Sequence, residues 1–166
     1  MDYFQGVVTE YLRADRSMFV NTECLLQLYP GNVPAKGAHW ICDAVAVNFR
    51  ESSVYLCEVT YSSTMQSLVT RLRAWEAKWP ALCLAFARDC SIPSTWNIRP
   101  WLFIPEKNKD ALRMKLAEFV KPGEVPGNMP QPLVTYLESV VPWKYPSWDR
   151  KKADIESAPE PKHGLN

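Results

Sequence analysis

Residues 39–61, HWICDAVAVNFRESSVYLCEVTY, decide the fold of this chain. The run from His39 to Phe49 is almost entirely apolar, which is typical of a β-strand buried on both faces. The run from Val54 to Tyr61 repeats this pattern, and residues 50–53 between them predict a hairpin turn. The sequence therefore predicts two neighbouring antiparallel strands in the middle of a sheet.

Each of these strands carries one acid among apolar neighbours, Asp43 in the first and Glu58 in the second. A buried carboxylate is costly unless it is paired, protonated or bound to a metal. Two carboxylates side by side also repel each other, and a divalent cation relieves that repulsion. Hard cations such as Mg²⁺ prefer oxygen ligands, and a bound metal can activate water for phosphodiester cleavage. Asp43 and Glu58 are therefore candidate metal ligands and catalytic residues.

The rest of the chain alternates between helical and strand-like patterns. Apolar residues at helical spacing predict helices, and short apolar runs predict strands. Pro100 lies inside the last predicted strand, which places that strand at an edge or a bulge. The predicted helices are 3–14, 65–79, 109–120 and 133–141, and the further predicted strands are 18–28, 81–87 and 98–104.

Length and composition indicate one globular domain with an extension. The chain has 166 residues, of which 47% are hydrophobic. With 19 basic and 18 acidic residues it has a formal charge of +1, which argues against binding nucleic acid through bulk charge and leaves a local basic groove open. Proline becomes frequent after residue 122. We expect a core at 1–121, a Pro/Trp-rich extension packing on it at 122–149, and a mobile tail at 150–166.

The cysteines and the N-terminus bear on the compartment. The five cysteines form no C-x-x-C pair, which argues against a structural zinc site. An odd number of cysteines without a recognisable signal peptide suits a reducing compartment. No stretch is long and apolar enough to span a membrane. The sequence predicts a cytoplasmic protein with no membrane partner.

The order of these elements resembles the core of the PD-(D/E)xK nuclease superfamily over residues 2–88. That core has a helix, three strands carrying an Asp and then a Glu-x-Lys, a second helix and a fourth strand. The resemblance implies an α/β (α+β) protein with a restriction-endonuclease-like αβββαβ core, in which helices flank a central mixed sheet. A C-terminal helix and a Pro-rich extension would follow. It also implies a nuclease that cleaves DNA with Mg²⁺ or Mn²⁺.

The resemblance assigns Asp43 and Glu58 to the two acids of the family motif. Thr60 stands where the family has its lysine, and Cys42 stands where it often has a proline. The lysine normally orients the attacking water and neutralises developing charge. Other members carry the basic group on the next helix, so Arg71 or Arg73 is the candidate substitute here.

Three further residues are candidates by their positions in the family pattern. Glu10 lies on the first helix, where some members contribute a third acidic ligand. Gln66, like Arg71 and Arg73, lies on the helix after the Glu strand, where polar groups often face the phosphate. His39 begins the Asp strand and is placed to contact substrate.

Several of these residues could also have a purely structural role. Asp43 could accept a hydrogen bond from a backbone amide at a strand end, and Glu58 could pair with Arg71 or Arg73. Glu10 could be a surface helix charge, and His39 an exposed strand-end residue. The segment at 141–148 contains two tryptophans; it either packs across the domain or offers an aromatic and basic strip to unpaired bases or a protein partner.

Three functions follow from this sequence. The first is a metal-dependent nuclease that cleaves phosphodiester bonds of DNA. The second is a catalytically inactive binding or assembly module of the same fold, which Thr60 in place of lysine favours. The third is a small accessory protein that acts through protein contacts alone. A homodimer would suit the first function, because paired cuts in duplex DNA need two sites.

Overall fold

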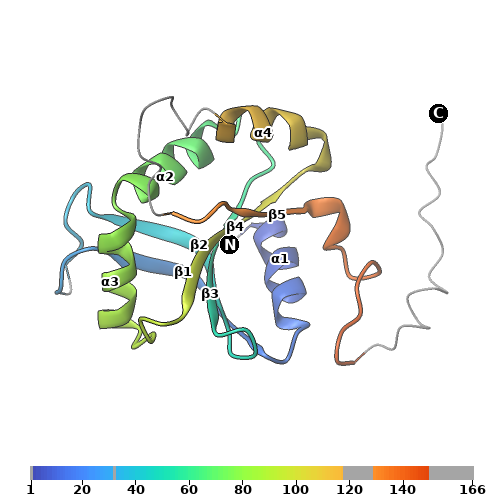
Figure 1. Cartoon of the computed structure of the whole chain (residues 1–166). Helices are drawn as coiled ribbons and strands as arrows, with labels where there is room; N and C mark the ends of the chain where they lie inside the picture. The colour runs from blue at the N-terminus through green and yellow to red at the C-terminus, as the bar shows by residue number, and fades with distance from the viewer. Residues whose placement is uncertain (1, 32, 118–128, 150–166) are drawn as a thin grey trace, which may run out of the picture.

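A computed structural model describes residues 2–31, 33–117 and 129–149 of the chain. In these residues a mixed five-stranded sheet is flanked by helices (Figure 1). The order along the chain is α1 (Tyr3–Arg13), β1 (Met18–Gln27), β2 (His39–Asn48), β3 (Ser53–Val59), α2 (Gln66–Ala77), α3 (Trp79–Asp89), β4 (Asn97–Ile104), η1 (Glu106–Asn108), α4 (Lys109–Ala117), β5 (Leu133–Tyr136) and η2 (Leu137–Ser139).

The strands lie in the order β1-β2-β3-β4-β5, so β3 is the central strand. β1 and β2 pair antiparallel, as do β2 and β3, whereas β3–β4 and β4–β5 are parallel. The antiparallel neighbours predicted from residues 39–61 are confirmed, with Ala44 opposite Cys57 in the register. The coarse fold class, a mixed sheet flanked by helices, is confirmed as well.

Two apolar clusters lie on opposite faces of the sheet. On one face, side chains of α2 and α3 such as Leu72, Trp75 and Phe86 pack with strand residues such as Leu56 and Leu102. On the other face, Val8 and Leu12 of α1 pack with Ala46, Cys57 and Phe103. The sheet is therefore the middle layer of three, which explains why β3 is buried along nearly its whole length.

The helix α1 begins with a capping box. Asp2 accepts a hydrogen bond from the backbone N–H of Gln5, and the Gln5 side chain accepts one from the N–H of Asp2. These contacts satisfy two backbone donors that a helix start otherwise leaves open. The predicted first helix, with Asp2 as its cap, is confirmed apart from its last residue.

The expected strand at 81–87 is wrong, because these residues belong to α3. The helix predicted at 65–79 is α2, which ends at Ala77, ahead of Pro80. A proline often marks the end of a helix. Proline is also favoured in the first turn of a helix, where its missing N–H is not needed, and Pro80 takes this position in α3. A short apolar run of this length cannot by itself separate a strand from a buried helix.

The expected helix at 133–141 is also wrong. Residues 133–136 form β5 along β4, and a single 3₁₀ turn follows. The register runs from Trp101 opposite Leu133 to Ile104 opposite Tyr136. This pairing joins segments that are distant in the sequence, so the local spacing of apolar residues does not reveal it. Pro100 precedes this doubly paired stretch of β4, so the part of β4 that holds it has β3 as its only strand neighbour in the described residues.

The C-terminal part of the chain contributes to the sheet. Within the extension expected at 122–149, the described residues 129–149 supply β5. The predicted helix at 109–120 is α4 over Lys109–Ala117, and its last three residues lie outside the described ones, as does the tail expected at 150–166. None of the helices in the described ranges is long and apolar enough to cross a membrane.

A pair of alanine substitutions in α3 tests the helix against the strand expected there. Leu82 is 1% exposed and Leu84 is 71% exposed. We expect Leu82→Ala to lower the free energy of unfolding by about 2–5 kcal/mol and Leu84→Ala to change it by less than about 0.5 kcal/mol, as measured by urea denaturation. Similar losses at both positions would contradict the helix, because residues two apart share one face of a strand.

Candidate functional site

The candidate site lies where β2 and β3 stop pairing. Their last paired residues at this end are Ala44 and Cys57, and Asp43 and Glu58 are the next residue on each strand. β3 continues beyond this point alongside β4, with Glu58 opposite Leu102 and Val59 opposite Phe103. Both acids are thus at one level of the sheet, at the C-terminal end of its central strand.

Two elements hold the carboxylate of Asp43. Its Oδ2 accepts a hydrogen bond from the backbone N–H of Val59 at 2.7 Å, and its Oδ1 accepts one from Nε2 of Gln5 on α1, also at 2.7 Å. The first contact is the hydrogen bond from a strand-end backbone amide that a purely structural role of Asp43 predicts. Because the carboxylate bridges β2 to β3 and to α1, its position is tied to that of both neighbours.

An irregularity in the strands accompanies Asp43. Cys42 packs in the cluster under α2 and α3, whereas Ala44, two residues later, packs in the cluster under α1. The usual alternation of side chains therefore reverses at Asp43. On β1, Glu23 lies opposite Asp43 between the pairs Thr22–Ala44 and Cys24–Cys42, and its backbone has a φ of 51°. The register gains no extra residue on either strand, so this left-handed residue marks a local distortion rather than a β-bulge.

The carboxylate of Glu58 is buried, with only 6% of its side chain exposed. Its Oε2 lies 2.5 Å from Nη1 of Arg71 on α2, and the same nitrogen donates a hydrogen bond to the carbonyl of Ile41 at 3.0 Å. The other oxygen, Oε1, is buried and has no hydrogen-bond partner among the described residues. One oxygen of this carboxylate is therefore paired with a cation, and the other is buried without a hydrogen-bond partner among the described residues.

Burial raises the pKa of Glu58 to about 7, and the negative charge of Asp43 adds to this rise. The Arg71 guanidinium opposes the rise, as does a contact with the Cys42 thiol that is too weak to satisfy Oε1. The neighbouring thiols of Cys42 and Cys57 are also buried. Burial and the charge of Glu58 raise the pKa of both thiols. Both cysteines are therefore neutral, inert neighbours of the acids rather than nucleophiles.

The arginine that reaches Glu58 is Arg71 rather than Arg73. Leu68, Leu72 and Trp75 are the buried face of α2, and Arg71 is on the same side because it precedes Trp75 by four residues. Arg73 is exposed. Gln66, the first residue of α2, is exposed too.

Thr60 follows the end of β3 and is half-buried. Its backbone N–H donates to the carbonyl of Phe103, and its Oγ1 accepts a hydrogen bond from the N–H of Ser62 at 3.3 Å. The residue at the position of the family lysine thus carries a hydroxyl and no charge. Arg71 is the cation that contacts the acid.

The described residues contain no group of three or more His, Cys, Asp or Glu side chains that could hold a metal ion. Glu10 is exposed and pairs with Arg13 at 3.4 Å. Glu23, although opposite Asp43 in the register, does not complete such a group either. His39 is half-buried, and its Nδ1 lies 2.7 Å from the carbonyl oxygen of Ala35. Asp43 and Glu58 are therefore two acids without a third protein ligand for a metal among the described residues.

Two participants in the site were not found from the sequence. Gln5 holds Asp43, and the carbonyl of Ile41 holds Arg71. The pattern of Asp2 followed by Gln5 signals a capping box, but nothing in it indicates that Gln5 also reaches a strand. A backbone carbonyl gives no signal in a sequence at all.

Comparison with known protein families and with curated proteins gives no match to this chain. A function for this chain is therefore inferred from the geometry of Asp43, Glu58 and Arg71.

The stability of a Glu58→Gln variant relative to the native protein should depend on pH. A carboxyl group whose pKa is about 7 when folded and near its ordinary value when unfolded stabilises the fold while protonated. This contribution is complete below the unfolded pKa and is lost as the pH rises through 7. Glutamine cannot ionise, so the free energy of unfolding of the variant should rise relative to that of the native protein by about 3–4 kcal/mol across this pH range, at about 1.4 kcal/mol per pKa unit.

The measurement is urea denaturation of both proteins from acidic to mildly alkaline pH. The difference between their free energies of unfolding removes the titration of all other groups. A pH-independent difference, or one that favours the native protein as the pH rises, would contradict the raised pKa.

Proposed function

We propose that this chain is a nuclease-like protein of the restriction-endonuclease-like fold, which cleaves phosphodiester bonds of DNA with a divalent cation held by Asp43 and Glu58. The observation that carries the proposal is the pair of acids at one end of neighbouring strands, in which Glu58 keeps a buried oxygen without a partner. A buried oxygen without a partner needs a physical explanation, and a bound divalent cation is one that suits a carboxylate.

The arrangement of elements supports the proposed fold. A helix, three antiparallel strands and a helix on the opposite face follow one another in the order that the resemblance requires. The fourth strand that the resemblance places at 81–87 is the helix α3, and a parallel strand comes only after it, as β4. Asp43 and Glu58 occupy the second and third strands, as the family motif does.

The two carboxylates suit Mg²⁺ or Mn²⁺. Mg²⁺ is usually bound through one or two carboxylates together with waters and substrate phosphates, so the lack of a third protein ligand among the described residues is no obstacle. Such an ion, when bound, would supply Lewis-acid activation of water and neutralise charge on the phosphate. Val59 and Gln5 hold Asp43 in place for this role, and β3 holds Glu58.

Arg71 has two tasks in this proposal. Its Nη1 binds both Glu58 and the carbonyl of Ile41, which fixes the guanidinium beside the acids. A guanidinium has further N–H donors that suit phosphate oxygens, and 31% of the Arg71 side chain is exposed. Arg71 therefore replaces the missing motif lysine, balancing Glu58 and binding the phosphate of the substrate.

A non-catalytic binding or assembly module is the second candidate. It is favoured by the same ion pair, because Arg71 already neutralises Glu58 without any metal, and by Thr60 in place of the motif lysine. In that case the fold would serve DNA or protein contacts, and the acids would be structural. A homodimer remains a prediction under either candidate.

Plasmid cleavage by the purified protein with Mg²⁺ or Mn²⁺ tests the first candidate. We expect Asp43→Asn and Glu58→Gln each to reduce cleavage by at least about 100-fold, as expected when a metal ligand or an electrostatic contact is lost. Arg71→Gln should reduce it by about 10–100-fold, because a charge-assisted phosphate contact is lost. Glu106→Gln, which alters an exposed acid near α4, is the matched control and should cleave normally.

Binding measurements separate the two candidates if cleavage is weak. If the protein is a nuclease, calorimetry should show that the native protein binds Mn²⁺. Asp43→Asn and Glu58→Gln should each lose this binding. A protein that binds neither cation and cleaves no nucleic acid, while its acid variants remain folded, would exclude the nuclease and leave the binding module.

A further inference from the structure

Two cysteines, Cys24 on β1 and Cys90 at the end of α3, line one cavity. The cavity has a volume of about 430 Å³ and lies between the edge strand β1, its neighbour β2 and the C-terminal end of α3. Its walls are mostly apolar, with Phe19, Val47 and Ile92 among the lining residues, and they include the thiols of Cys24 and Cys90. No part of the proposed nuclease chemistry uses this region.

The surroundings of Cys90 place it over the middle of β1. Cys90 lines the 430 Å³ cavity together with Cys24, and it also lines a second, smaller cavity with residues 25–28 of β1 and the loop after it. Cys90 thus lines both cavities along β1, and Cys24 lines the larger one with it. Arg88 fixes the end of α3 against the same strand, since its guanidinium donates hydrogen bonds to the carbonyls of Gln27 at 3.1 Å and Leu28 at 3.0 Å.

The two thiols differ in access. Cys90 is exposed and is the C-terminal cap of α3, followed by Ser91 with a φ of 52°. Cys24 is half-buried, and burial together with the nearby Cys90 raises its pKa. Burial and the charge of Asp89 raise the pKa of Cys90 as well. Among the other cysteines, Cys42 and Cys57 are buried in the sheet, whereas Cys83 is half-buried on α3. A reagent in solution thus meets Cys90 first, and Cys24 is the thiol beside it.

We propose that Cys24 and Cys90 are a dithiol modification site that closes to a disulfide by exchange with a small disulfide such as glutathione disulfide. The Cys90 thiolate attacks one sulfur of glutathione disulfide, forming a mixed disulfide and releasing one glutathione thiolate, which takes up a proton. The Cys24 thiolate then attacks the Cys90 sulfur and releases the second glutathione. The two protein thiols are oxidised, and the glutathione disulfide is reduced to two glutathione molecules. The new bond joins the edge strand to α3.

The test is to incubate the reduced full chain with glutathione disulfide at mildly alkaline pH, where more thiolate forms. The products are then alkylated under denaturing conditions and measured by intact mass and peptide mapping. We expect the five thiols to fall to three without bound glutathione, and the map to join Cys24 to Cys90. Cys24→Ser should stop at a single glutathione on Cys90, whereas Cys90→Ser should form no disulfide within the chain.

Cys83→Ser is the matched control, because Cys83 is half-buried like Cys24 and lies on α3. This variant should form the disulfide at the native rate. Circular dichroism of each variant shows that the fold is kept. The proposal is overturned if the native chain keeps five thiols, if it accumulates glutathione on Cys90 without closing, or if the map joins any other pair. These outcomes are independent of whether the protein cleaves DNA.

Discussion

The neutralisation of the buried carboxylate of Glu58 is the constraint on which the arrangement of this molecule depends. Glu58 belongs to the central strand β3, and its charge is balanced from α2 by Arg71. Removing one partner of a buried ion pair typically costs about 3–5 kcal/mol, because the other charge is left uncompensated. The pair thus fixes the position of α2 along the sheet, and the core side chains Leu68, Leu72 and Trp75 set its rotation.

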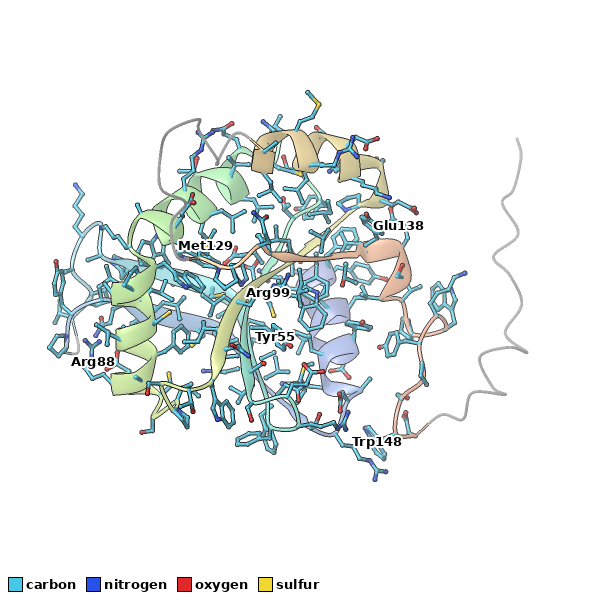
Figure 2. The ribbon with its side chains drawn as sticks, viewed as in Figure 1. Tyr55, Arg88, Arg99, Met129, Glu138 and Trp148 are labelled. Atoms are coloured by element: carbon cyan, nitrogen blue, oxygen red, sulfur yellow. The ribbon has the colours of Figure 1, made fainter. Side chains whose placement is uncertain are left out.

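Asp43 adds the second half of the same arrangement. The strands β2 and β3 separate beyond Ala44 and Cys57, and the Asp43 carboxylate fills this point by accepting the N–H of Val59. Figure 2 shows how densely side chains pack between the helices and the sheet. The structural use of the acids is compatible with the catalytic use that we propose: the contacts that hold the carboxylates also orient them, and Arg71 contacts Glu58 without any cation.

The sequence predicted the parts of the fold that depend on local pattern. The apolar runs of β2 and β3 and the capped helix α1 could be read from it, as could the two isolated acids. The segment that forms α3 was ambiguous because its apolar run suits a strand as well as a buried helix. β5 could not be predicted because it depends on pairing with β4, a contact made across distant parts of the chain. At the site, the choice of Arg71 over Arg73 followed from the rotation of α2, and Gln5 had no signal.

The most direct test of a metal site at the acid pair is the anomalous scattering of a crystal of the native protein soaked in Mn²⁺. We expect a peak between the carboxylates of Asp43 and Glu58, at about 2.0–2.6 Å from an oxygen of each, as is usual for hard cations with oxygen ligands. The same soak of a Glu58→Gln crystal should show no peak there. Native crystals with no peak at this position, and with Arg71 still seated on Glu58, would show that the acids serve the fold alone.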